Sequence, residues 1–247
     1  MINKGFTLIE IIIALFVASI IMAAMFGAVN MAQHTSTGIE RKVIAQQDVR
    51  GALDLMALEI RMASYNQGLD NSIWRAPNDC TTNSANPTYK GIQATPGFSM
   101  ANSITVEMDI CDTSKIPPPP ACKPFGQNSN EIITYTYDAP NLRITRATNC
   151  GGAMSFLGDT AASGRPRIVH VINGNAGVNV PLFRYFDFNN VEIQPANLPA
   201  LIPNIRTIEI FLVVETENID PTTNARKRLV YSTCVIPRNH GISGVTR

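Results

Sequence analysis

One carboxylate near the start of the chain requires a partner because of its place in the sequence. Glu10 directly precedes residues 11–29, which carry no charge and are apolar except for Ser19 and Gly27. As a helix with a rise of about 1.5 Å per residue, this segment covers roughly 28 Å, close to the hydrocarbon thickness of a bilayer. An ionised group at the edge of such a segment is costly unless it is neutralised. Glu10 therefore needs a cation.

Other residue types that could do chemistry are scattered. The three histidines, His34, His170 and His240, form no metal-binding doublet, and solvated or core-satisfied rings are the better interpretation. Hydrolase, phosphate-loop, zinc-protease and dinucleotide motifs are missing from the sequence. The basic run at residues 226–228 is expected to be the solvated end of a hairpin, and the net charge is only +1. We therefore predict no catalytic, cofactor-binding or metal-binding residue, no enzymatic activity and no nucleic-acid partner.

The five cysteines have no C-x-x-C spacing, which argues against zinc and redox motifs. All of them follow the apolar segment. Cys111 and Cys122 bracket a run of four prolines, a stiff loop whose ends a disulfide could hold together. We expect Cys111 to pair with Cys122 and Cys80 with Cys150, and Cys234, within an apolar strand, to be a buried free thiol.

The beginning of the chain fits neither of two simpler explanations. A secretory signal has an apolar core of about 7 to 15 residues, shorter than the one here, and a plain membrane anchor leaves the acid unexplained. The run Gly5-Phe6-Thr7-Leu8-Ile9-Glu10 closely resembles the processing site of type IV prepilins and type II secretion pseudopilins. The resemblance implies that prepilin peptidase cuts after Gly5 and that Phe6 becomes an N-methylated amino terminus. It also implies that Glu10 pairs with the amine of Phe6 in a neighbouring subunit.

The first segment continues beyond the membrane length as an amphipathic helix. Apolar residues recur mostly at three- or four-residue steps between charged ones, at Ile39, Val43, Val49, Leu53, Met56 and Ile60. Proline first occurs at position 77, so one helix from residue 6 to about residue 65, roughly 90 Å long, is predicted. Its first half would lie in lipid or a fibre core, and its second half would pack on a head.

The remaining sequence indicates a β-rich head. Residues 103–110 alternate apolar and polar side chains, which predicts a half-buried strand. Further strands are expected at residues 130–138, 141–148, 167–172, 182–188, 207–216 and 228–236. Residues 138–141 read as a hairpin turn, and residues 217–226 as a polar loop joining the last two strands into a long hairpin. The predicted fold class is α+β and pilin-like, with a long N-terminal helix packed on an antiparallel sheet. Its parts are a leader at residues 1–5, the helix at 6–66 and the head at 67–247.

A second resemblance narrows the family. Residues 50–65 look like the helix end of PilW-type minor pilins and, less closely, of J-type minor pseudopilins; residues 132–138, 183–187 and 235–239 also match the PilW-like pattern. This implies a minor type IV pilin near the fibre tip or in a priming complex. Its partners would be prepilin peptidase and other major and minor pilins. It would be held in the bacterial inner membrane with its head exported until it joins an extracellular pilus. The alternatives are a J-type minor pseudopilin of a type II secretion system and a membrane-anchored β-domain that binds a ligand.

Overall fold

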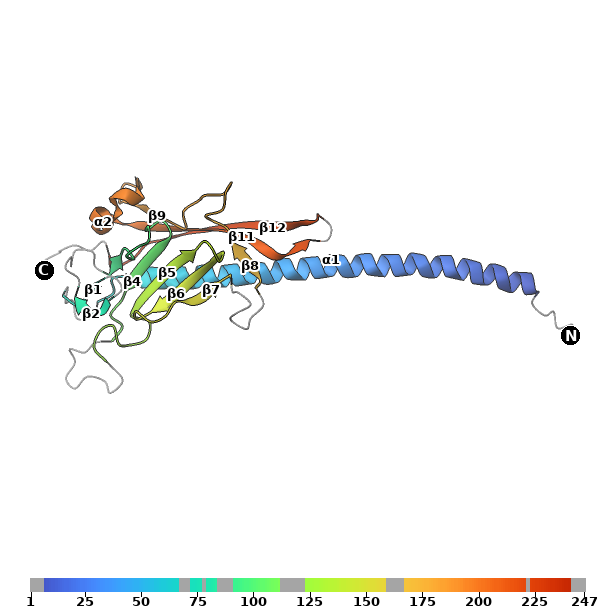
Figure 1. Cartoon of the computed structure of the whole chain (residues 1–247), viewed down its shortest axis with the longest axis horizontal. Coiled ribbons are helices and arrows are strands. Elements are labelled where there is room, and N and C mark those ends of the chain that lie inside the picture. The colour runs from blue at the N-terminus through green and yellow to red at the C-terminus, as the bar shows by residue number, and fades with distance from the viewer. Residues whose placement is uncertain are drawn as a thin grey trace.

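The computed structural model describes residues 7–66, 72–76, 79–83, 91–111, 123–158, 167–220 and 223–240. One long helix runs the length of the molecule, and a β-rich head surrounds only its C-terminal part (Figure 1). The sheets of the head are antiparallel. The predicted α+β, pilin-like fold class is therefore confirmed.

Helix α1 spans Leu8–Met62, 55 residues, or about 82 Å at the standard rise. Thr7 is its N-cap and Ala63 its C-cap, and Ser64 follows with a φ of 64°, a left-handed conformation that ends the helix. The end predicted near residue 65 was thus about three residues too far. The predicted start at Phe6 lies outside the described residues.

The head covers less of α1 than the sequence predicts. From Leu8 to Ile44 every residue except Gly38 is exposed, including two members of the predicted apolar stripe, Ile39 (60% exposed) and Val43 (42%). Burial starts at Ala45 and continues at Val49, Ala52, Leu53, Met56, Ala57 and Ile60. The stripe is shorter because apolar spacing shows which face of a helix can pack, but not how far along the helix the sheets reach.

The first sheet has the strand order β3-β4-β5-β6-β7. Its strands are β3 (Ile92–Gln93), β4 (Ser103–Glu107), β5 (Ile132–Asp138), β6 (Arg143–Thr148) and β7 (Met154–Leu157). The predicted hairpin turn joins β5 to β6, whose end residues Asp138 and Arg143 face each other. On the face toward α1, the rings of Tyr135 and Phe156 pack edge to face with centroids 5.2 Å apart.

Strand β4 differs from the half-buried strand that its alternation predicts, because all five of its residues are buried. Its serine and threonine hydroxyls bond other hydroxyls of the head. The Glu107 carboxylate accepts hydrogen bonds from Gln93 Nε2 at 2.7 Å and from the Arg75 backbone N–H at 3.0 Å. Polar partners within the head thus take the place of water on the second face of β4.

The second sheet has the order β10-β9-β11-β12, with β8 also paired to β11. Its strands are β8 (Val169–Val171), β9 (Phe183–Phe186), β10 (Glu192–Ile193), β11 (Thr207–Asp220) and β12 (Ala225–Val235). The loop predicted at residues 217–226 is wrong, because β11 and β12 extend through most of it and pair up to Asp220 and Ala225. Polar side chains do not prevent this pairing because backbone groups make the ladder bonds.

Smaller elements complete the head. Strands β1 (Arg75–Ala76) and β2 (Asp79–Asn83) form a two-stranded sheet, and the short helix α2 (Leu198–Leu201) lies between two 3₁₀ turns, Pro195–Asn197 and Ile202–Asn204. Residues from α1 and from both larger sheets share one apolar core. The second half of α1 is thereby fixed to the head, while its first half projects away from it (Figure 1).

Candidate functional site

The start of α1 holds Glu10 in a reciprocal cap. The backbone N–H and the hydroxyl of Thr7 donate to Glu10 Oε2 at 2.9 and 2.8 Å, and the Glu10 N–H donates to Thr7 Oγ1 at 3.4 Å. This is a capping box, which satisfies backbone donors at the helix start and places a negative charge there. The role of Thr7 was missed, although the spacing Thr-x-x-Glu is its known sequence signature. Gly5 and Phe6, the predicted processing residues, lie outside the described residues, so the pairing of Glu10 with a Phe6 amine stays a prediction.

The projecting half of α1 presents an apolar surface with its polar groups satisfied. Every large apolar side chain from Leu8 to Met31 is exposed. The Ser19 and Thr35 hydroxyls donate to backbone carbonyls one turn earlier, at 2.7 and 2.9 Å. Within the described residues, α1 is long and apolar enough to cross a membrane. Such a surface requires an apolar environment, either lipid or protein.

A buried polar cluster joins α1 to the first sheet. Glu59 accepts a hydrogen bond from the Tyr135 hydroxyl, and the Arg146 guanidinium contacts both of its carboxylate oxygens, at 2.6 and 3.2 Å. Burial of the Tyr135 hydroxyl, together with its bond to Glu59, raises the pKa of Tyr135. We call Glu59, Tyr135 and Arg146 the junction cluster. Its geometry fixes the rotation and height of the helix against the head.

The end of the described chain closes onto the end of α1. The Arg238 N–H donates to the Arg61 carbonyl at 3.3 Å, which satisfies a carbonyl in the last helical turn. His240 is buried; its Nε2 lies 2.7 Å from the Ile202 carbonyl oxygen, and its Nδ1 lies 3.0 Å from the Ser64 hydroxyl. His240 is therefore a core-satisfied histidine that ties the last segment to the helix.

The other histidines lie elsewhere. His34 is exposed on α1, and His170 on β8 has its Nε2 at 2.5 Å from Glu217 Oε2 while Arg167 contacts its other ring nitrogen at 2.8 Å. Burial is the main cause that lowers the pKa of His170. The structure does not bring the three rings together, and the described ranges contain no cluster of potential metal ligands.

The cysteines follow the predicted pairing in part. Cys80 of β2 and Cys150, which follows β6, form a disulfide. Cys111 is also disulfide-bonded, and Cys122 lies outside the described residues. The prediction that Cys234 is buried is wrong: the thiol is free and exposed. Alternate residues of β12 point away from α1, and Cys234 is on that outer face whereas Val235 is on the buried one.

Comparison with known proteins identifies the start of the chain. Residues 1–26 match the family model described as the prokaryotic N-terminal methylation motif. No curated protein and no solved structure matches the chain. The match covers the capped start of α1 and most of its uncovered apolar segment, and it supports a type IV pilin or pseudopilin that prepilin peptidase processes.

Proposed function

We propose that this chain, whose first 26 residues match the prepilin-type motif, is a minor type IV pilin of the PilW-like class. In this proposal prepilin peptidase cleaves after Gly5, Phe6 is N-methylated, and the apolar half of α1 holds the subunit in the inner membrane until it enters a fibre. The observation that carries the proposal is the combination of this motif with a helix whose first half is apolar and uncovered. The role is structural rather than enzymatic.

The capping box supplies a physical route for the assembly step. Before assembly, Thr7 satisfies the Glu10 carboxylate within the same chain, which lowers the cost of an acid at the edge of the membrane. In the fibre, the carboxylate would accept the amine of Phe6 from a neighbouring subunit. In the bonds from Thr7 only the acceptor is charged, whereas the amine would bring a full opposite charge, so the exchange of partners favours assembly.

The same apolar surface would serve in two environments. In the membrane it faces lipid tails, and in the fibre it would face other pilin helices. Both environments remove it from water, so the hydrophobic contribution changes little between them. Specific pairs such as Glu10 with Phe6 then decide the direction of transfer.

Four segments, one on α1 and three on the head, support the finer assignment to the PilW-like class. Residues 50–65 include the packed end of α1, residues 132–138 form β5, and residues 183–187 include β9. Residues 235–239 begin with the last residue of β12 and contact Arg61. The resemblance thus falls on the packed end of α1 and on strands whose buried residues share its apolar core. A large head also opposes close repetition along a shaft, which favours a place near the tip.

Mass analysis of the membrane-extracted protein tests the processing step. We expect the mature chain to begin with methylated Phe6. A mature start at Met1, or after Ala24, would exclude a prepilin.

The assembly step is tested with Glu10→Ala and a matched control, Glu40→Ala, which removes an exposed acid from the same helix. Glu10→Ala should be inserted and cleaved normally but enter purified fibres less well, because only Glu10 lies where a neighbouring amine is expected. Glu40→Ala should behave as the natural protein does. Equal incorporation of both variants would contradict the proposed pairing.

Two measurements locate the subunit. Co-purification with sheared pili, rather than with a secretion complex, separates a minor pilin from a J-type pseudopilin. In the same pili, quantitative mass spectrometry should give a small ratio of this chain to the major subunit. A ratio near one would contradict a place at the tip.

A further inference from the structure

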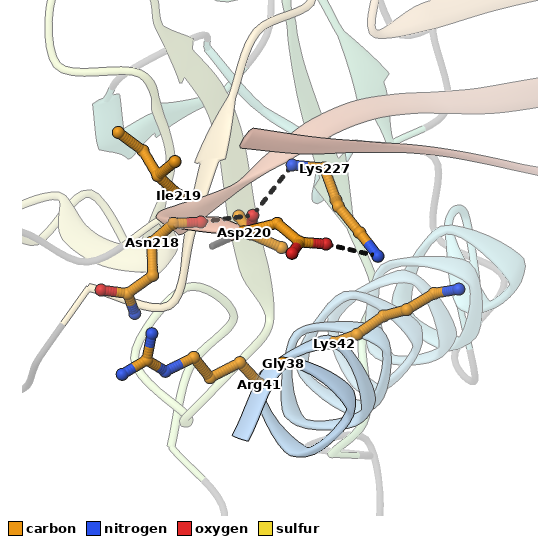
Figure 2. A pocket seen from close by; sticks show the side chains of 8 residues that line it. Gly38, Arg41, Lys42, Asn218, Ile219, Asp220 and Lys227 are labelled. Atoms are coloured by element: carbon orange, nitrogen blue, oxygen red, sulfur yellow. Dashed lines mark hydrogen bonds and ion pairs between the residues drawn. The ribbon is translucent and has the colours of Figure 1, made fainter. Parts of the chain in front are cut away.

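The β11–β12 hairpin reaches further along α1 toward its N-terminus than any other described part of the head (Figure 1). At one end of β12, the Arg238 N–H bonds the Arg61 carbonyl. At the other end, Lys227 lies in a small pocket that Gly38 also lines (Figure 2). The distances from Arg238 to Lys227 along the strand and from Arg61 to Gly38 along the helix are each about 35 Å at the standard rises. Strand β12 therefore runs alongside the helix and in the same direction.

The described end of this hairpin, Thr223 and Asn224, is called the turn here, and it lies close to the end of the membrane segment. Asn224 is three residues beyond Lys227, which adds about 10 Å, or about seven residues of helix below Gly38. Counted from Lys42, which lines the same pocket, the level is near residue 35, so the turn lies just beyond the apolar segment at residues 11–29. Residues 11–39 are free of charge and span about 43 Å, which equals a bilayer including its headgroup layers. With α1 across a bilayer, the turn lies in the headgroup layer.

Two of the basic side chains on the hairpin are neutralised by acids. Lys227 Nζ lies 2.7 Å from Asp220 Oδ2 across the hairpin, a pair visible in Figure 2. Arg228 lies 3.0 Å from Glu215. These pairs leave little net charge at their own positions.

Three other cations near the turn form no ion pair with an acid within the described residues: Arg41, Lys42 and Arg226. Arg41 and Lys42 follow the uncharged segment and extend to opposite sides of α1 beneath the hairpin (Figure 2), and Glu40 is the acid of the same turn. Arg226 pairs in register with Ile219, whose side chain is 53% exposed. Cations beside an exposed apolar side chain are typical of segments that lie at a membrane surface.

We propose that the turn of the β11–β12 hairpin rests on the headgroup layer of the bilayer that α1 spans, and that Arg226, with Arg41 and Lys42, binds anionic phospholipid headgroups there. This contact belongs to the subunit before assembly and rests on the membrane insertion proposed above. Each cation close to an anionic surface favours the contact about fivefold. The attraction is screened beyond a Debye length of about 8 to 10 Å.

The test places a fluorophore on the full chain in vesicles that contain a headgroup-attached quencher. One label is at Thr223→Cys in a Cys234→Ser background, and the control label is on Cys234 of the natural chain, about 36 Å away along the strand. The vesicles are phosphatidylcholine alone or mixed equally with phosphatidylglycerol. We expect quenching of the label at the turn but not of the control label, and we expect it to increase with phosphatidylglycerol and decrease with salt.

Charge variants decide whether Arg226 causes the contact. Arg226→Gln should lower the ratio of surface-bound to free hairpins about fivefold in anionic vesicles. Arg238→Gln, which removes an exposed arginine at the far end of the same hairpin, should leave the ratio unchanged. An effect of Arg238→Gln equal to that of Arg226→Gln would overturn the proposal.

The remaining outcomes separate the two proposals. A chain that does not float with the vesicles contradicts both the membrane insertion and the lipid contact. A chain that floats but whose turn is quenched no more than the Cys234 label contradicts the lipid contact alone. A turn that becomes protected only in assembled fibres would assign this surface to a neighbouring subunit instead of a lipid.

Discussion

Replacing the buried Glu107 by glutamine should make the head more stable at neutral and alkaline pH. The Glu107 side chain is almost fully buried in β4, and its carboxylate accepts hydrogen bonds from Gln93 and from the Arg75 backbone. Burial is the main cause that raises the pKa of Glu107 from its ordinary 4.5 to about 8, against the opposing effects of Arg75. The neighbouring Gln93 Oε1 is buried without a hydrogen-bond partner in the described part of the chain, so a proton on Glu107 also supplies a donor beside it.

The raised pKa fixes the sign and size of the effect. Between pH 4.5 and 8 the folded state keeps a proton on Glu107 that the unfolded state has released, so the free energy of unfolding falls as pH rises through this range. Below pH 4.5 both states are protonated and the group contributes no pH dependence. The shift from 4.5 to about 8 corresponds to a loss of about 5 kcal/mol above pH 8. Glu107→Gln removes this loss and should gain a few kcal/mol there, while near pH 4.5 it should be close to neutral.

The chain carries its own probe for this measurement. Trp74, the single tryptophan, is 2% exposed and packs against Phe125, so its fluorescence reports unfolding of the head. Urea unfolding of the full chain in detergent at several pH values gives the free energy of unfolding. Glu107→Asp is the control, since it retains a buried carboxyl and should keep the pH slope while losing stability at every pH. If the natural protein and Glu107→Gln have the same slope between pH 4.5 and 8, the reasoning is refuted.

Two further predictions concern what holds the head together. Glu59→Ala should lower the free energy of unfolding by about 1 to 3 kcal/mol, because it leaves the buried Tyr135 hydroxyl without its acceptor and the partly buried Arg146 with Asn130 alone, whereas Tyr135→Phe should cost only about 0.5 to 1.5 kcal/mol because Arg146 still neutralises Glu59. Equal losses in urea unfolding would contradict a charge-based role for the junction cluster. Replacing both Cys80 and Cys150 by serine should cost at most about 4 kcal/mol, since their disulfide closes a loop with a sequence separation of 70. Under reducing conditions the double variant and the natural protein should have the same electrophoretic mobility. An unchanged free energy of unfolding would show that packing alone constrains this loop.

The elements that the sequence predicts well are those with local, repeated patterns. α1 and the paired strands β5 and β6 follow from periodic apolar spacing and a turn at residues 138–141. Strands β1, β3 and β10 were not predicted, because two residues cannot display a period. β2 and β7 were missed as well: β2 is polar and largely exposed, and β7 has no buried residue except Leu157.

Contacts between residues far apart in the sequence account for most of the remaining differences between the predicted and the observed structure. Glu59 and Arg146 are 87 residues apart, and nothing local in the sequence relates them. The sequence identified Glu10 as a residue that needs a partner, but the partner within the described residues is Thr7, three positions earlier. Cys234 was expected to be buried because its strand is apolar. β12 is an edge strand with one face open, and side chains of successive residues alternate between its two faces, which leaves Cys234 on the exposed one.

The lengthwise arrangement of β12 alongside α1 has a mechanical consequence. A force that draws the subunit along the axis of α1 acts parallel to the helix–head interface. It therefore loads that interface in shear, so that the contacts of Ala45, the junction cluster and the Arg238–Arg61 bond share the tension at the same time. A head attached across the axis would instead peel away one contact after another. The geometry suits a subunit that is pulled by its helix.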